Sequence, residues 1–345
     1  MCCIINEIVG ISMKQKSLLS IKDILKKSRV MLAPMAGTTD FGYRELVREM
    51  SKGLIFTEMI SAKALVYGDK KTRTLLRFND NQRPVGVQLF GSEPDFMAKA
   101  AKIVEEEFYP NVIDINMGCP VPKIVNNCEG SALMRNPTLA AEIVAAMSEA
   151  VEIPITVKMR AGFNDRELNA PLLAQRVVEA GAKMVSVHGR TREQYYNGKA
   201  DWGIIKQVKE AVRVPVVGNG DIFTPYDAVK MFNETNCDAV MIARGAQGNP
   251  WLFEQVESYL KTGEFNKPST LDKLSTMKKH LKLAVEDKGE YTGVREMRSH
   301  LAWYVKGMPR SASFRQRLFQ ETCYDEVCKM LDQFVLNLQS NDDDN

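Results

Sequence analysis

A cysteine that follows a short apolar run is the first candidate for chemistry in this sequence. Residues 112–116 read Val-Ile-Asp-Ile-Asn, a β-branched pattern typical of a strand buried on both faces. Gly118 and Pro120 then interrupt the run on either side of Cys119, and both residue types end strands. We therefore expect the Cys119 thiol on a loop at the C-terminal end of a strand, held by a rigid element yet accessible.

Eight such apolar runs alternate with amphipathic segments of helix length, among them residues 93–108, 137–151, 170–180 and 225–232. The predicted strands are Val30–Ala33, Leu54–Thr57, Val85–Leu89, Val112–Asn116, Ile155–Lys158, Met184–His188, Val214–Gly218 and Ala239–Ala243. Eight β/α units at this spacing predict an α/β fold of the (β/α)8 TIM barrel type. A doubly wound sheet is the alternative, but the count of eight and the absence of G-x-G-x-x-G after the first strand disfavour it.

The barrel predicts where a site would lie, because active sites of such barrels occupy the C-terminal ends of the strands. The residues at these ends are Pro34, Met35, Ala36, Glu58, Gln88, Asn116, Cys119, Lys158, Arg160, His188, Arg190, Asn219, Gly220, Asp221, Arg244 and Gly245. Strands that simply give way to polar loops are the alternative explanation. Lys158 and His188 favour a site, since a charged or polar group directly after a buried run needs a partner.

Two glycine-bearing loops, residues 218–221 and 243–246, follow the seventh and eighth predicted strands. Barrels of this type often bind a phosphate there, because glycine lets backbone N–H groups approach the oxygens. Arg244 can add a charge-assisted hydrogen bond.

The pattern changes after Trp251, and no strand signal returns. Segments 271–288, 294–306 and 313–337 predict a small C-terminal helical bundle. Residues 273–317 hold eleven Lys or Arg against four Asp or Glu. A face for RNA phosphates with Trp303 and Tyr304 as stacking surfaces is one interpretation, and a solvated helical surface with buried aromatics is the other.

Composition sets the broad class. The 345 residues are 45% hydrophobic and 26% charged, with a net charge of +3 that by itself implies no polyanionic partner. The seven cysteines are scattered without C-x-x-C, which predicts reduced thiols, a cytoplasmic protein and no metal site. No apolar run approaches a membrane span. Residues 1–13 are apolar but make a poor signal peptide, because Glu7 interrupts them. Residues 1–20 are expected to be an N-terminal extension, with Met1 or Met13 as the start.

Seven motifs in order carry a resemblance to a known family. They are residues 33–40 (APMAGTTD), 114–120 (DINMGCP), 130–134 (GSALM), 157–162 (VKMRAG), 188–191 (HGRT), 218–221 (GNGD) and 244–246 (RGA). The chain closely resembles the tRNA-dihydrouridine synthases, nearest to their bacterial B-type subgroup, from about residue 20 to about residue 337.

This resemblance implies an FMN-dependent oxidoreductase that reduces a D-loop uridine of tRNA to 5,6-dihydrouridine, with NADPH or NADH as reductant. It assigns Cys119 as the proton donor. The implied cofactor contacts are Pro34, Met35, Ala36, Gln88, Lys158, His188, Asn219, Gly220, Asp221, Ala243 and Arg244.

Contacts to the RNA substrate are predicted at the mouth and in the bundle. They are Asn116, Arg160, Arg190 and Arg192, and then Lys278, Lys279, Arg295, Arg298 and Arg315. For Arg190 and Arg192 the alternative is an ordinary loop charge. The expected domains are a catalytic barrel over 21–267, a tRNA-binding domain over 268–338 and an acidic tail over 339–345, in a monomer.

Two other functions remain open at this point. An FMN barrel that oxidises a free pyrimidine, of the dihydroorotate dehydrogenase kind, would carry a similar thiol or hydroxyl after the fourth strand but would not need the basic helical region. A non-catalytic RNA-binding barrel would not need Cys119, Lys158 and His188 together.

Overall fold

The predicted barrel is present in the computed structural model, which describes residues 19–342. Its eight strands are parallel and close in sequence order, with β8 paired to β1. They are β1 (Val30–Leu32), β2 (Ile55–Ser61), β3 (Val85–Phe90), β4 (Val112–Met117), β5 (Ile155–Arg160), β6 (Val185–His188), β7 (Val216–Asn219) and β8 (Ala239–Ile242). The sequence placed every strand to within a few residues. β2 extends furthest beyond its prediction, through a register shift between Phe56 and Met59.

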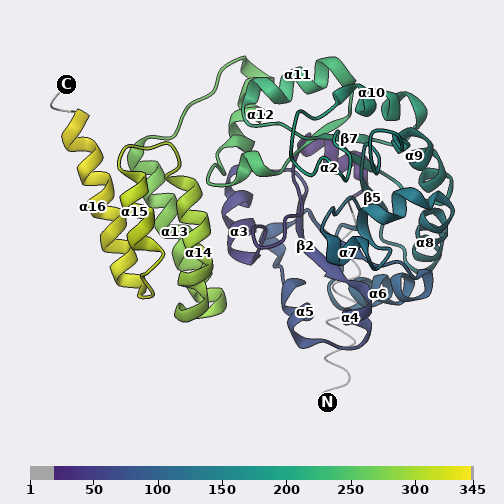
Figure 1. The fold of residues 1–345 in the computed structure, drawn as a ribbon, viewed down its shortest axis with the longest axis horizontal. Helices are drawn as coiled ribbons and strands as arrows, with labels where there is room; N and C mark the ends of the chain where they lie inside the picture. Colours follow the sequence, from purple (N-terminus) through teal and green to yellow (C-terminus); the bar gives the residue numbers. More distant parts are fainter. Residues whose placement is uncertain (1–18, 343–345) are drawn as a thin grey trace.

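Helices surround the barrel and connect its strands (Figure 1). They are α2 (Ile21–Lys27), α3 (Phe41–Met50), α4 (Ala62–Val66), α5 (Lys70–Leu75), α6 (Pro94–Glu107), α7 (Pro122–Val125), α8 (Pro137–Ala150), α9 (Ala170–Glu179), α10 (Trp202–Ala211), α11 (Pro225–Thr235) and α12 (Leu252–Thr262). Three 3-10 turns complete the loops: η1 (Asp80–Gln82), η2 (Gly130–Arg135) and η3 (Arg244–Ala246).

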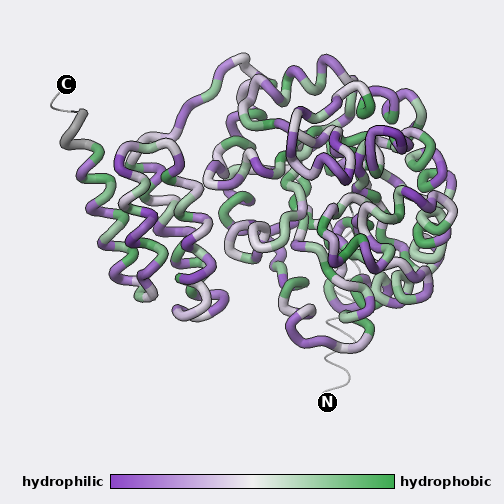
Figure 2. Tube along the Cα trace, in the orientation of Figure 1, coloured by the Kyte–Doolittle hydropathy of each residue, from purple (hydrophilic) through white to green (hydrophobic). Residues whose placement is uncertain are grey.

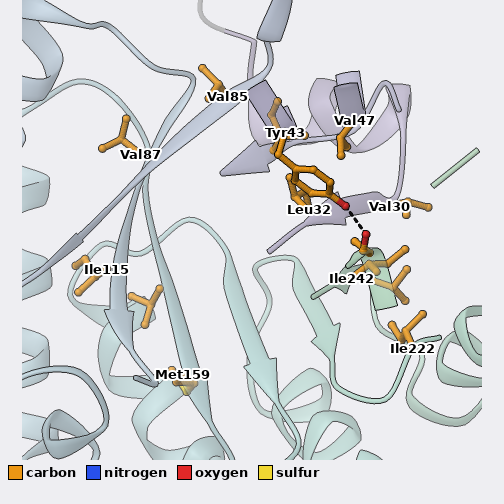
Figure 3. Close-up of a cluster of buried hydrophobic side chains, with 14 of the residues drawn as sticks. Val30, Leu32, Tyr43, Val47, Val85, Val87, Ile115, Met159, Ile222 and Ile242 are labelled. Atoms are coloured by element: carbon orange, nitrogen blue, oxygen red, sulfur yellow. Dashed lines mark hydrogen bonds between the residues drawn. The ribbon is translucent and has the colours of Figure 1, made fainter. Parts of the chain in front are cut away.

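Alternation along the strands sorts side chains between two cores. Ile113 and Ile115 of β4 point outward into the core that the surrounding helices cover, part of which Figure 3 shows. Val112 points into the barrel, where it packs with Met31 and Phe56. The next inward residues of β4 are Asp114 and Asn116, so the barrel interior changes from apolar to polar toward the C-terminal ends of its strands.

The N-terminal end of the barrel is closed by α2. Ile21 and Ile24 of this helix belong to the same interior cluster as Met31 and Met184. Gly86 makes room in this layer, because a Cβ there would lie 2.5 Å from the Phe56 ring. Because α2 closes the N-terminal end, the described part of the barrel is open only at the C-terminal ends of its strands.

The C-terminal helices lie side by side against the barrel at α3 (Figure 1). They are α13 (Thr270–Lys288), α14 (Glu290–Tyr304), α15 (Ser311–Leu318) and α16 (Tyr324–Asp342). Hydrophilic and hydrophobic residues interleave along all four (Figure 2). Tyr43 of α3 anchors the contact, since its ring lies 5.3 Å from that of His280 and 5.6 Å from that of His300. The Tyr43 hydroxyl donates to the carbonyl of Ala246, the dashed bond in Figure 3.

The single helix predicted over 313–337 is wrong, because the chain breaks between α15 and α16. The Glu321 carboxylate accepts the backbone N–H groups of Thr322 and Cys323, and its carbonyl accepts the Arg298 guanidinium. These local hydrogen bonds compete with helical ones and hold the break. α16 continues to Asp342, into the segment expected as a tail.

No helix among the described residues is long and apolar enough to cross a membrane. Most of the predicted N-terminal extension, and with it the choice between Met1 and Met13, lies outside the described residues.

Candidate active site at the mouth of the barrel

A cavity of about 390 Å³ opens at the C-terminal ends of the strands. Every predicted cofactor contact lines it, together with Cys119 and two of the predicted mouth residues. This set is Pro34, Met35, Ala36, Gln88, Asn116, Cys119, Lys158, Arg160, His188, Asn219, Gly220, Asp221, Ala243 and Arg244. Residues from all parts of the barrel sequence therefore converge on one space, as closure of the barrel requires.

The Cys119 loop is held by backbone hydrogen bonds. The Asn116 side-chain oxygen accepts the N–H groups of Gly118 at 3.0 Å and Cys119 at 2.8 Å. Ser131 donates both its N–H and its hydroxyl to the Cys119 carbonyl. Gly130 is required beside it, because its φ is +60° and a Cβ would lie 3.1 Å from that of Cys119. The thiol is thus partly buried, free and fixed in place.

Burial raises the pKa of the Cys119 thiol, although the positive charges of Arg160 and Lys158 oppose this. The thiol is consequently protonated at neutral pH, as a proton donor must be. A thiolate nucleophile would need the opposite shift.

Lys158 and His188 provide a positive charge and a neutral imidazole. The Lys158 ammonium donates to the Asn219 side-chain oxygen at 3.2 Å, and burial with the neighbouring Arg160 lowers its pKa to about 8. Burial and the same positive charges lower the pKa of His188 well below its usual range. The buried Nε2 of His188, in this cavity-lining side chain, has no hydrogen-bond partner within the described protein.

An ion pair between a buried arginine and a partly exposed aspartate lies at the end of the cavity near β7 and β8. Arg190 donates to both oxygens of Asp221, at 2.7 and 2.9 Å, and to the carbonyls of Asn197 and Gly198. Arg244 donates to Asp221 at 3.3 Å. Burial alone would raise the pKa of Asp221, but the hydrogen bonds from Arg190 and Ala200 outweigh it and lower that pKa.

The predicted role of Arg190 as a contact to RNA phosphate does not fit this placement. Its side chain is 3% exposed, and its guanidinium is occupied by Asp221 and by backbone. Arg160 is similarly 2% exposed and donates to the carbonyls of Gly118, Thr191 and Tyr195, although it still lines the cavity. Arg192 lies outside the cavity lining, beside the rings of Phe163 and Tyr195.

The sequence reasoning missed two groups of site residues. Tyr196 and Phe223 line the cavity, are about half exposed and flank the Arg244 guanidinium, at 4.5 and 5.8 Å from their ring centres. No pattern marked them, because they stand in irregular loops. Asp114 and Thr156 lie in the polar layer beneath the cavity. A carboxylate inside a strand buried on both faces was a signal for Asp114.

The five basic residues of the bundle that were predicted to contact RNA form a first group, whose side chains all have partners in the protein. Lys278 pairs with Asp332, Lys279 with Glu49 of α3, and Arg298 with the carbonyl of Glu321. Arg295 lies over the Tyr291 ring and donates to its carbonyl, while Arg315 donates to that of Ser311.

A second group, Lys306, Arg310 and Arg317, is exposed and has no side-chain partner among the described residues. Tyr304 is 5% exposed and packs against His280, so it offers no stacking surface, contrary to the first interpretation from sequence.

The fold and this site define a (β/α)8 barrel protein with its cavity at the end where such barrels carry their active sites. The family model described as dihydrouridine synthase matches residues 31–340. A probable tRNA-dihydrouridine synthase of Rickettsia bellii is 44% identical over 300 residues, 86% of this chain and 92% of the relative. The tRNA-dihydrouridine synthase B of Pseudomonas aeruginosa is 38% identical over 91% of this chain and 95% of its own length.

The chain belongs to the dihydrouridine synthase family. Among solved structures, histamine dehydrogenase from Rhizobium sp. 4-9 superposes with a TM-score of 0.54 at 16% identity, covering 74% of this chain and 49% of that one. This likeness concerns the barrel fold alone.

Proposed function

We propose that this protein reduces the C5=C6 bond of a D-loop uridine in tRNA to 5,6-dihydrouridine, with FMN as cofactor and NADPH or NADH as reductant. The observation that carries the proposal is a single cavity that joins a protonated thiol, Cys119, to Lys158 and His188 in a chain of this family. Family membership and the names of the relatives support the tRNA reaction over the oxidation of a free pyrimidine and over a non-catalytic RNA-binding role.

The cavity fits an anionic ligand with hydrogen-bonding ring atoms. Lys158, Arg160 and Arg244 line it, whereas Asp221 is the one carboxylate that the described residues contribute to the lining, and it is already paired. A ligand atom would supply the partner that the buried His188 Nε2 lacks within the described protein. Gly220 borders this position. Its φ is +119°, and a Cβ there would lie only 2.9 Å from the His188 ring. A side chain at position 220 would therefore displace His188.

FMN would be held by Gln88, Lys158 and His188 near its ring and by the loops of Asn219 to Asp221 and of Ala243 and Arg244 near its phosphate. When bound, it supplies the hydride that uracil C6 needs. Cys119 holds the proton for C5 on its sulfur, because burial keeps the thiol protonated at neutral pH. Lys158 would hold a positive charge near the bound ring and would stabilise negative charge that develops there.

The uridine must leave its stack to reach Cys119, because the thiol lies inside the mouth. Tyr196 and Phe223 offer exposed rings at this mouth, and Arg244 between them adds positive charge. We assign tRNA contacts to Asn116 and, in the bundle, to the exposed cations of α15 and of the loop between α14 and α15. Lys278 and Lys279 are not assigned this role, because their charges are paired within the protein.

We further propose that residues 21–267 form the catalytic domain and 268–338 the tRNA-binding domain of a cytoplasmic monomer that uses no metal.

The decisive experiment incubates the purified protein with FMN, NADPH and unmodified tRNA and measures dihydrouridine by mass spectrometry of the nucleosides. We expect dihydrouridine to form in the tRNA, and C119A to form little of it. Oxidation of dihydroorotate without any change to tRNA would replace the proposal by the free-pyrimidine reaction. Colourless protein that binds tRNA but no FMN would favour the non-catalytic alternative.

A further inference from the structure

Asp114 is a buried carboxylate inside the barrel to which the proposed chemistry assigns no role. Its side chain is 1% exposed. β4 places it directly between Gln88 of β3 and Thr156 of β5, its register partners on either side. The carboxylate accepts a hydrogen bond from the Gln88 amide at 2.7 Å and another from the Thr156 hydroxyl.

Hydrogen bonds continue from Asp114 to the cysteine loop in one direction. The Gln88 Nε2 donates to Asp114, which leaves the Gln88 Oε1 to accept from the Asn116 Nδ2 at 2.8 Å. The Asn116 Oδ1 is then free to accept the backbone N–H groups of Gly118 and Cys119. Each amide in this chain has one end that must donate and one that must accept.

The two ends of this chain are fixed chemically. Burial raises the pKa of Asp114 to about 6, so its carboxylate is still ionised at neutral pH and only accepts, whereas a backbone N–H only donates. A single orientation of the two intervening amides satisfies both ends, because turning either one over would set two acceptors or two donors face to face. Leaving a buried polar group unpaired in this way is costly.

We propose that Asp114 is a positioning residue that sets the amide orientation of Gln88 and Asn116 and thereby holds the Cys119 loop. Asp114 is not among the residues that line the cavity, so it acts on the site through its neighbours. Any effect of Asp114 on the rate of dihydrouridine formation rests on the proposed function. Its effect on the geometry of the Cys119 loop does not.

Two variants separate the negative charge of Asp114 from its ability to accept a hydrogen bond. In D114N the new amide oxygen can still accept from Gln88 while its NH2 group faces Thr156, whose hydroxyl can accept as well as donate. In D114L no acceptor is left for the Gln88 amide. T156V is the matched control, because it removes the other partner of Asp114 and leaves the path to Cys119 intact.

A double variant tests the direction of the hydrogen bonds that run from position 114 through Gln88 to position 116. In N116D an acceptor would face the Gln88 Oε1, so the Gln88 amide would have to turn over and confront the Asp114 carboxylate with its oxygen. Combining N116D with D114N removes this conflict. The new amide at position 114 then donates to Gln88, and Gln88 donates to the new carboxylate at position 116. That carboxylate still accepts the N–H groups of Gly118 and Cys119.

The readout is the rate at which iodoacetamide alkylates Cys119, followed across pH in full-length protein and assigned by mass spectrometry of its peptide. We expect D114N and T156V within about twofold of the parent, D114L and N116D changed several-fold or more, and the double variant restored toward the parent. Alkylation of Cys237, a buried cysteine two residues before the start of β8, reports loss of folding.

Several outcomes would overturn the inference. One is an unchanged Cys119 profile in folded D114L, and another is an equal change in D114N and D114L, which would make charge the cause. If D114L fails to fold, failure of the D114N/N116D pair to restore the profile of the parent decides against it. Because this readout needs neither FMN nor tRNA, it stands or falls separately from the proposed reaction.

Discussion

The mouth of the barrel and the C-terminal bundle are both rich in positive charge, yet they hold it differently. At the mouth Arg160 and Arg190 are buried, and their N–H groups are used by backbone and by Asp221. In the bundle Lys306, Arg310 and Arg317 are exposed and unpaired within the described residues. The buried arginines at the mouth therefore hold the loops in place and keep positive charge inside the protein, while the exposed cations of the bundle remain available to bind a polyanion.

The comparison also shows why a basic residue is a poor marker by itself. Arg190 and Arg317 are the same residue type near predicted RNA-binding surfaces. One has a 3% exposed side chain in a bidentate ion pair, and the other has an exposed side chain. Only their surroundings separate a structural arginine from one that can meet a phosphate.

The largest expected effect tests whether the mouth is a catalytic site at all. C119A should lower dihydrouridine formation by about 10²- to 10⁴-fold, because it removes the proposed proton donor, while FMN and tRNA binding persist. Rates come from nucleoside mass spectrometry under single-turnover conditions. The matched control is C128A, which removes an exposed thiol nearby and should retain activity. Full activity in C119A would remove the thiol from the acid role.

A second prediction tests whether arginine at the mouth is structural. R190L should destabilise the fold by about 3 kcal/mol, since it leaves Asp221 without its main partner in a partly buried site. Urea denaturation measures this change. K63A, which breaks the exposed pair of Lys63 with Glu93, should cost no more than about 1 kcal/mol. Equal losses of unfolding free energy in R190L and K63A would show that the buried arginine contributes no more to stability than an exposed ion pair.

A third prediction concerns pH. The Lys158 ammonium carries its proton below a pKa of about 8 and loses it above that value. FMN affinity should therefore fall by up to about tenfold as the pH rises from about 7 to about 9, because the positive charge beside the ligand disappears. Quenching of FMN fluorescence by apoprotein measures it. In K158R, FMN affinity should stay high across this pH range, because arginine keeps its charge. In K158M it should stay low. If FMN affinity in K158M still falls with pH as in the parent, another group is responsible for the titration.

The smallest expected effect sharpens the other half of the comparison. The triple variant K306A/R310A/R317A should weaken tRNA binding several-fold and flatten its salt dependence, by about 0.7 to 0.9 in slope for each phosphate that is no longer neutralised. K278A/K279A is the control, because these two ammonium groups already pair with Asp332 and Glu49. A larger change in the control than in the triple variant would move the RNA surface to α13.

Much of the site was predictable because its pattern is local. A strand buried on both faces, then a polar residue, then glycine and cysteine placed Cys119 at the mouth once eight such units were recognised. The bundle was less predictable. The break between α15 and α16 depends on a carboxylate at Glu321 and on Arg298 from another helix, and no periodicity in residues 313–337 reports that contact.

The sequence by itself determined the barrel, the order of its units and the set of residues at the strand ends, because alternation and strand-ending residues are properties of short segments. Tertiary structure alone decided which charged and polar groups face one another. Asp221 meets Arg190 across two loops, Lys279 of α13 meets Glu49 of α3, and Asp114 meets Gln88 and Thr156 across three strands. Such pairings depend on register and packing between segments far apart in the chain, and a carboxylate acquires its role from the groups that packing brings to it.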